Sequence, residues 1–319
     1  MYKSSPSKLS SEQFSCNLQC KRLSGPGLRL RAMYSSYVGG ITTDVSLMSI
    51  PIDDHMVHRG HGVYDSGGVS ARALAEVDSH VHRLLHSAIE AGIHIPNDWS
   101  HESIVNIVRC TIEAAENLDG AYRIFLSSGP GGFGIHSSEC EETCLYVIVY
   151  NRAEGLESGT PISEITVSTG HIPMKPANLA RIKSVNYLPN VLLADFARTH
   201  GGNFGLWVDE SHKLKEGSIV SVFLISKDNI IISPSSGDIL EGCTVRTLAR
   251  ICEQLNLVSS VEFRDVDVSE LYSAIEVIVC GGDEMLYPVT CVDGTLISSG
   301  VVGPVCKALL AMSRPLSSL

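Results

Sequence analysis

Long apolar runs and an excess of positive charge are both missing from this chain of 319 residues. Even the run at residues 145–150 is far shorter than the roughly 18 apolar residues that a membrane-spanning helix needs, which predicts a soluble protein without a membrane partner. The formal charge of −11 reflects 24 Lys and Arg against 35 Asp and Glu. Because nucleic-acid affinity comes mainly from cationic side chains, we exclude a nucleic-acid partner.

Paired-cysteine metal motifs are also missing, although the chain has ten cysteines. Cys16 and Cys20, like Cys140 and Cys144, do not have the C-x-x-C spacing of zinc knuckles, and the other six are scattered. We therefore expect reduced thiols and no metal site. Two of these thiols stand in apolar stretches and should pack as small hydrophobic side chains, namely Cys252 and Cys280.

The first 36 residues differ in composition from the rest of the chain. They are rich in Ser, Lys and Arg, and Glu12 is their single acid. This composition is typical of organelle transit peptides, so we predict a disordered targeting segment at residues 1–36, with an ordinary solvated tail as the alternative. The predicted destination is the chloroplast, and mitochondrion or cytoplasm are the alternatives.

Short apolar runs alternate with amphipathic patterns through the remaining residues, which predicts a mixed α/β protein. We expect an N-terminal α/β domain at residues 37–150, a linker at 151–161 and a second α/β domain at 162–319. The expected helices are at residues 80–91, 104–118, 190–199 and 245–256. The expected strands are at residues 38–41, 122–127, 145–150, 165–169, 205–209, 218–225, 261–266 and 275–280.

The turn-rich stretch at residues 54–65 holds three histidines beside two glycines. His55, His58 and His61 are three residues apart, a spacing that neither a helix through the glycines nor a strand would bring together on one metal ion. We interpret His58 and His61 as bonded to backbone groups of a tight loop. Arg59 has another interpretation, because a guanidinium ahead of a strand could bind a substrate carboxylate through two hydrogen bonds.

Two further stretches each contain one candidate ionisable group. Lys183 has the apolar neighbours Ile182 and Val185, so its amine could be desolvated as a Schiff-base lysine requires, although a surface lysine would also fit. Glu216 precedes an apolar run, and its carboxylate could form a charge pair inside a site or remain a solvated acid beside Lys215.

Residues 239–246 lead through Gly242 into a predicted helix. The free N–H groups and positive dipole end of that helix could bind an anion such as phosphate. Thr244 as an ordinary helix N-cap fits the same residues. This stretch alone leaves both interpretations open.

Taken in order and at these separations, the motifs resemble the class IV (fold-type IV) pyridoxal-phosphate aminotransferases. The resemblance covers residues 34–310 and is strongest to the plant chloroplast D-amino-acid transaminase and aminodeoxychorismate lyase-like branch, through residues 52–65, 127–132 and 183–192. It implies a two-domain α/β (α+β) fold with pyridoxal 5'-phosphate in the interdomain cleft, and a homodimer.

The resemblance also implies roles for individual residues. Lys183 would bond the cofactor and move the substrate proton, Glu216 would pair with the ring nitrogen, and Arg83 would bind the phosphate. Further phosphate contacts would come from Cys243, Thr244 and Gly282. Gly282 replaces a threonine of the family, and Ile219 and Ser221 also depart from the pattern, which predicts looser cofactor support.

The resemblance implies amino acids and 2-oxo acids as substrates, and an amino transfer from a small D-amino acid such as D-alanine to 2-oxoglutarate. The Arg and His that bind the carboxylate in bacterial D-amino-acid transaminases are absent from residues 129–133, so we assign that role to Arg59. Tyr64 and Tyr187 are predicted as wall or hydrogen-bonding residues. Alternatives are a lyase that converts 4-amino-4-deoxychorismate to pyruvate and 4-aminobenzoate, branched-chain L-amino-acid transfer, and a catalytically silent cofactor-binding homologue.

Overall fold

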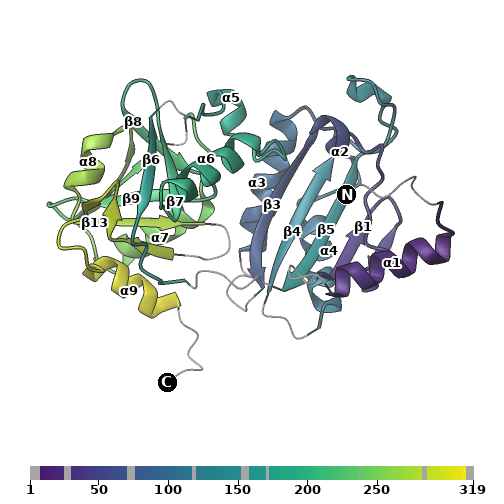
Figure 1. Ribbon diagram of the computed structural model, residues 1–319, viewed down its shortest axis with the longest axis horizontal. Helices are drawn as coiled ribbons and strands as arrows, with labels where there is room; N and C mark the ends of the chain where they lie inside the picture. The colour runs from purple at the N-terminus through teal and green to yellow at the C-terminus, as the bar shows by residue number, and fades with distance from the viewer. Residues whose placement is uncertain are drawn as a thin grey trace. The chain divides into compact units, whose positions relative to one another are not determined.

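The computed structural model describes residues 8–24, 30–69, 76–116, 120–151, 158–169, 172–235, 237–281 and 286–313. The chain forms two compact units, Met1–Glu154 and Gly155–Leu319, whose elements are labelled in Figure 1. Among the described residues, no helix combines the length and apolar character that crossing a membrane requires.

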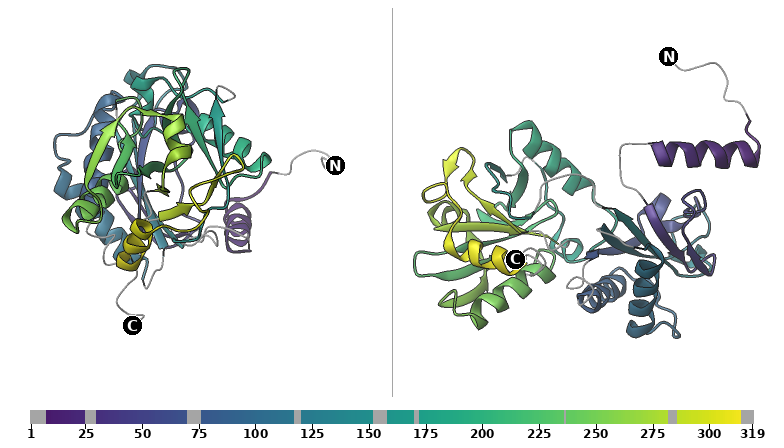
Figure 2. Two further views of the ribbon diagram at one scale, coloured as in Figure 1. Left: turned by 90° about the vertical axis from the view of Figure 1, so that its left-hand side faces the viewer. Right: turned by 90° about the horizontal axis from the view of Figure 1, so that it is seen from below.

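The first unit is built on an antiparallel sheet with the strand order β2-β1-β5-β4-β3. Its strands are β1 (Leu30–Ser35), β2 (Gly40–Thr42), β3 (Gly62–Val69), β4 (Gly120–Ser127) and β5 (Cys144–Asn151). Helices α3 (Val77–Glu90) and α4 (His101–Ala114) lie side by side against this sheet (Figure 2). The other helical segments are α1 (Ser11–Ser24), α2 (His55–Arg59) and the 3-10 helix η2 (Ser137–Glu139).

Helix α4 shows why an apolar pattern predicts the presence of a helix more accurately than the residues at which the helix begins and ends. Ile104, Val108 and Ile112 are buried on one stripe, the spacing that predicted a helix at residues 104–118. The helix begins earlier because the hydroxyl of Ser100 accepts a hydrogen bond from the backbone N–H of Ser103 at 3.0 Å.

Two expectations for the N-terminal region are wrong. Residues 11–24 form α1 and residues 30–35 form β1, so the head contains folded elements and the sheet begins before residue 37. The strand expected at residues 38–41 is a turn followed by the start of β2. The sequence pattern did not predict β1, because the exposed cation of Arg31 interrupts an apolar run whose Ala32 and Met33 are buried.

The second unit contains two sheets, with the strand orders β11-β10-β9-β13-β14 and β12-β8-β7-β6-β15-β16. The first sheet consists of β9 (Ser221–Ile225), β10 (Ile230–Pro234), β11 (Ser260–Arg264), β13 (Glu276–Cys280) and β14 (Leu286–Val289). The second consists of β6 (Ile165–Thr169), β7 (Phe204–Val208), β8 (Lys213–Gly217), β12 (Val266–Asp267), β15 (Cys291–Val292) and β16 (Thr295–Leu296). Its helices are α5 (Ala177–Ala180), α6 (Leu188–Thr199), α7 (Cys243–Gln254), α8 (Val268–Ser273) and α9 (Pro304–Ser313).

Strand β9 contributes to two hydrophobic cores. Val222 and Leu224 pack in the core between the two sheets, whereas Phe223 and Ile225 pack in the core that includes residues of α7 and α9. Successive side chains of a strand point to opposite faces, so the uninterrupted apolar sequence of β9 follows from burial on both faces.

The second of these cores contains the two thiols expected to pack as hydrophobic side chains. Cys252 and Cys280 are both buried there, which confirms that prediction. Burial raises the pKa of Cys280 to about 12, so its thiol stays protonated at neutral pH.

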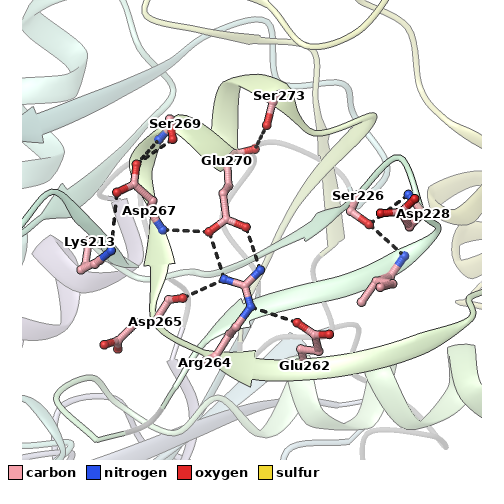
Figure 3. Close-up of polar contacts among 11 residues, drawn as sticks. Lys213, Ser226, Asp228, Glu262, Arg264, Asp265, Asp267, Ser269, Glu270 and Ser273 are labelled. Atoms are coloured by element: carbon pink, nitrogen blue, oxygen red, sulfur yellow. Dashed lines mark hydrogen bonds and ion pairs between the residues drawn. The ribbon is translucent and has the colours of Figure 1, made fainter.

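A charged network joins the end of β11 to α8 (Figure 3). The guanidinium of Arg264 donates to both carboxylate oxygens of Glu270, at 3.0 and 2.7 Å. Glu270 also accepts from the backbone N–H of Asp267 at 3.0 Å, and the two residues form a capping box at the start of α8. The strand expected at residues 261–266 is divided at this point into β11 and β12.

Candidate active site

Lys183 lies in the second unit, on the segment that connects α5 to α6. Its side chain is half-buried, and its Nζ donates to the hydroxyl of Tyr187 at 3.4 Å. Tyr187 is the N-cap residue of α6. The neighbouring Ile182 is buried, so the segment packs against the rest of the second unit.

Glu216 is buried at the end of β8, and its Oε2 accepts from the backbone N–H of Leu240 at 3.3 Å. The expected strand at residues 218–225 is therefore wrong at its start. Glu216 belongs to the preceding strand, which ends at Gly217, and β9 begins at Ser221. The placement supports the interpretation of this carboxylate as a group inside a site, because a solvated loop acid would be exposed.

Asn190 connects the lysine segment to the strand that contains Glu216. Its buried side chain donates from Nδ2 to the backbone oxygen of Ser218 at 2.6 Å. Asn190 belongs to α6 and Ser218 directly follows β8, so this bond fixes the two elements relative to each other. No motif of the sequence predicts a role for Asn190, although a polar residue among the buried positions of a helix is a signal that could have suggested one.

The N terminus of α7 has no side-chain cap. Gly242 is the N-cap residue, and because glycine has no side chain it cannot accept a hydrogen bond from the first N–H groups of the helix. A Cβ at this position would lie 2.5 Å from the Oγ of Ser221 and 3.0 Å from Cγ1 of Val245, so a larger residue would displace its neighbours. Gly242, Ser221 and Glu216 line one pocket.

Thr244 is not the N-cap of α7, and the alternative that made it one is wrong. Its hydroxyl donates to the backbone oxygen of Gly281 at 2.9 Å and ties the first turn of α7 to the end of β13. Cys243 is the first residue of the helix. Gly282, which was expected to complete the phosphate contacts, lies outside the described residues.

Arg83 lies on α3 in the first unit, where it forms an ion pair with Asp65 of β3. Its Nε and Nη2 donate to the two carboxylate oxygens at 2.7 and 2.8 Å, and Nδ1 of His80 lies 2.9 Å from the same carboxylate. Burial would raise the pKa of Asp65, but Arg83 and His80 outweigh it and hold this pKa well below its usual range. The phosphate role of Arg83 remains a prediction.

The histidine stretch is held mainly by backbone contacts. Nε2 of His58 lies 3.2 Å from the backbone oxygen of Asp53, and Nε2 of His61 lies 3.1 Å from that of Ala91, which confirms the interpretation of these two side chains. Within the described ranges, no cluster of His, Cys, Asp or Glu is arranged to hold a metal ion. Burial, aided by the charges of His58 and its neighbours, lowers the pKa of His55, which favours the neutral imidazole.

Arg59 donates to three backbone oxygens. Its Nε lies 2.7 Å from the oxygen of Gly134, its Nη1 lies 3.0 Å from that of His58, and its Nη2 bonds that of Phe133. The guanidinium therefore holds the loop at residues 133–134, and its carboxylate role stays a prediction. The predicted role of Tyr64 in the wall of the substrate site also stays a prediction. The centroid of its ring lies 5.1 Å from the guanidinium carbon of Arg123.

Comparisons with known proteins agree with this fold. Residues 62–292 match the family model described as amino-transferase class IV. The chloroplastic D-amino-acid transaminase of Arabidopsis thaliana is 38% identical over 293 residues, which are 91% of this chain and 77% of that protein. A putative branched-chain-amino-acid aminotransferase of Methanocaldococcus jannaschii is 26% identical, over 86% of this chain and 93% of that protein.

A solved structure of a branched-chain amino acid aminotransferase from T.th., with pyridoxamine 5'-phosphate, shares the fold with a TM-score of 0.78. It is 21% identical, and the match covers 90% of this chain and 93% of that one. The chain belongs to the class IV aminotransferase family, and the expected two-domain α/β fold is that of the family.

Proposed function

We propose that this class IV aminotransferase is a pyridoxal-phosphate-dependent D-amino-acid transaminase. The observation that carries the proposal is the presence, in one compact unit, of the half-buried Lys183, the buried Glu216 and the N terminus of α7, whose N-cap residue is Gly242. The D-amino-acid donor is supported by the relative from Arabidopsis thaliana. The reaction converts D-alanine and 2-oxoglutarate to pyruvate and D-glutamate.

The residues of the second unit fit the chemical groups of pyridoxal phosphate. Lys183 offers an amine to the aldehyde, Glu216 offers a carboxylate to the protonated ring nitrogen, and the first N–H groups of α7 offer donors to the phosphate. When bound, this cofactor accepts the electron pair that the substrate's Cα releases with its proton.

Each of these residues performs one physical task. Glu216 would hold the proton on the ring nitrogen, and its burial limits the screening of its charge by water. Nζ of Lys183 would accept the proton from the substrate Cα and deliver it to C4′ of the cofactor, while the hydroxyl of Tyr187 orients this amine. Cys243 and Thr244, in the first turn of α7, would hold the phosphate at the N terminus of this helix.

A paired panel of D- and L-amino acids tests the proposal. Purified holoenzyme is incubated with each donor and 2-oxoglutarate, and the glutamate formed is resolved by chiral chromatography. We expect D-glutamate from D-alanine, whereas L-glutamate formed only from branched-chain L-amino acids would contradict the donor assignment. Pyruvate release from 4-amino-4-deoxychorismate without any oxo acid would assign the lyase reaction instead.

We also propose that the protein acts in the chloroplast as a homodimer. The chloroplastic relative and the Ser-, Lys- and Arg-rich composition of residues 1–36 support the location. Because β1 pairs with both β2 and β5, a transit peptide would have to be cut before Leu30. N-terminal sequencing of the protein after import into isolated chloroplasts tests the location, and light scattering tests the dimer.

A further inference from the structure

A second lysine lies near Lys183 in the same unit. Lys175 is half-buried on the segment before α5, and its Nζ is 5.0 Å from the centroid of the Tyr187 ring. Nζ of Lys183 is 5.8 Å from the centroid of the same ring. The two ammonium groups therefore share one aromatic neighbour, whose quadrupole attracts both.

The fold constrains the backbone of Lys175. The indole N–H of the buried Trp207, in β7, donates to the backbone oxygen of Ile172 at 3.0 Å. On the other side, Pro176 is the N-cap residue of α5, and a following proline restricts the backbone of the residue before it. The backbone of the short segment that contains Lys175 is therefore constrained on both sides, by the hydrogen bond to Ile172 and by Pro176.

The ammonium of Lys175 forms no hydrogen bond or ion pair with any residue in the ranges that the structure describes. A buried ammonium is usually paired with a carboxylate, and Lys215 in β8 is an example. Its Nζ lies 3.0 Å from a carboxylate oxygen of Asp209 and 2.5 Å from one of Asp238. Burial lowers the pKa of Lys175, the attraction of Glu216 opposes this, and the charge of Lys183 adds to it. A partly desolvated cation of this kind gains stability when an anion binds.

We propose that Lys175 binds the α-carboxylate of the amino acid and oxo acid substrates. This inference rests on the function proposed above. The α-carboxylate is bonded directly to Cα, the substrate atom that exchanges its proton with Lys183, so its counter-ion has to be near Lys183. Arg59 already donates to three backbone oxygens, whereas Lys175 donates to no described residue.

Three variants test the proposal, namely Lys175→Met, Lys175→Arg and the control Lys307→Met, which removes an exposed cation from α9. For each holoenzyme, KM and kcat are measured for D-alanine and 2-oxoglutarate, and the Kd of butanoate is measured by calorimetry. Butanoate has a carboxylate but no group that can react, so its binding does not depend on turnover.

We expect Lys175→Met to raise both KM values and the Kd of butanoate by at least about tenfold, with kcat changed by less than about threefold. Lys175→Arg, which keeps the charge, should retain most of the butanoate affinity, and Lys307→Met should match the wild type. Unchanged KM and Kd in Lys175→Met would overturn the proposal, as would a rise in KM for 2-oxoglutarate alone. A wild type that binds butanoate but transfers no amino group would count against the proposed function and not against this site.

Discussion

Asp65 and Arg83 form a two-point ion pair inside the first unit. The Nε–Oδ2 and Nη2–Oδ1 distances are 2.7 and 2.8 Å, the Asp65 side chain is fully buried, and that of Arg83 is 12% exposed. The pair joins β3 to α3 and holds the guanidinium for which the family resemblance predicts a contact with the cofactor phosphate. Loss of one partner would leave a buried charge without compensation.

Replacing Asp65 with Asn should therefore destabilise the protein. We expect the free energy of unfolding to fall by about 3 kcal/mol, measured by urea denaturation followed by circular dichroism. The matched control is Asp78→Asn, which breaks an ion pair with Arg109 whose two side chains are about half exposed. Exposed pairs contribute little, so the control should lose much less, and equal losses in the two variants would contradict the role of the Asp65 pair.

The same pair predicts how stability depends on pH. The folded protein holds the pKa of Asp65 below its value in the unfolded chain, which is about 4. The stabilisation is therefore complete above about pH 4 to 5 and is lost as the pH falls toward the folded pKa. The difference in the free energy of unfolding between the wild type and Asp65→Asn should therefore become smaller as the pH falls through this window. A difference that stays constant from pH 7 to pH 3 would contradict the account.

Gly242→Ala tests the N terminus of α7 as the phosphate site. The added Cβ would meet the Oγ of Ser221 at 2.5 Å and displace the start of the helix, so we expect the Kd of pyridoxal phosphate to rise about tenfold or more. The control is Gly237→Ala, where a Cβ would have no atom within 4 Å. Cofactor affinity is measured by absorbance titration of the apoprotein. Equal affinities in both variants would show that the phosphate is bound elsewhere.

Much of the fold could be predicted from apolar periodicity, but charged strands could not. The strand β9 and the helix α4 bury regular apolar patterns, and both were expected at nearly the observed places. β8 has the sequence KLKEG, in which Lys215 and Glu216 are buried. Lys215 tolerates burial because Asp209 and Asp238 neutralise it, and that pairing depends on residues that only the folded chain brings together.

In the candidate site, too, the residues that could not be predicted are those whose partners lie elsewhere in the sequence. Lys183 and Glu216 could be found from local motifs, because each lies in a short stretch that resembles the family. Lys175 could not, since its significance comes from Tyr187, twelve residues later, and from a chain turn that no local pattern specifies. Asn190 was missed for a similar reason, because its partner Ser218 lies on another element.

The central claim is that Lys183, and not the neighbouring Lys175, bonds the cofactor. Borohydride reduction of the holoenzyme makes this bond permanent, and tryptic digestion followed by mass spectrometry locates it. A reduced adduct on Lys183 blocks cleavage there and appears on the peptide of residues 182–198, whereas an adduct on Lys175 would appear on the peptide of residues 153–181. We predict the first result, and an adduct on the second peptide, or none on either, would contradict the account.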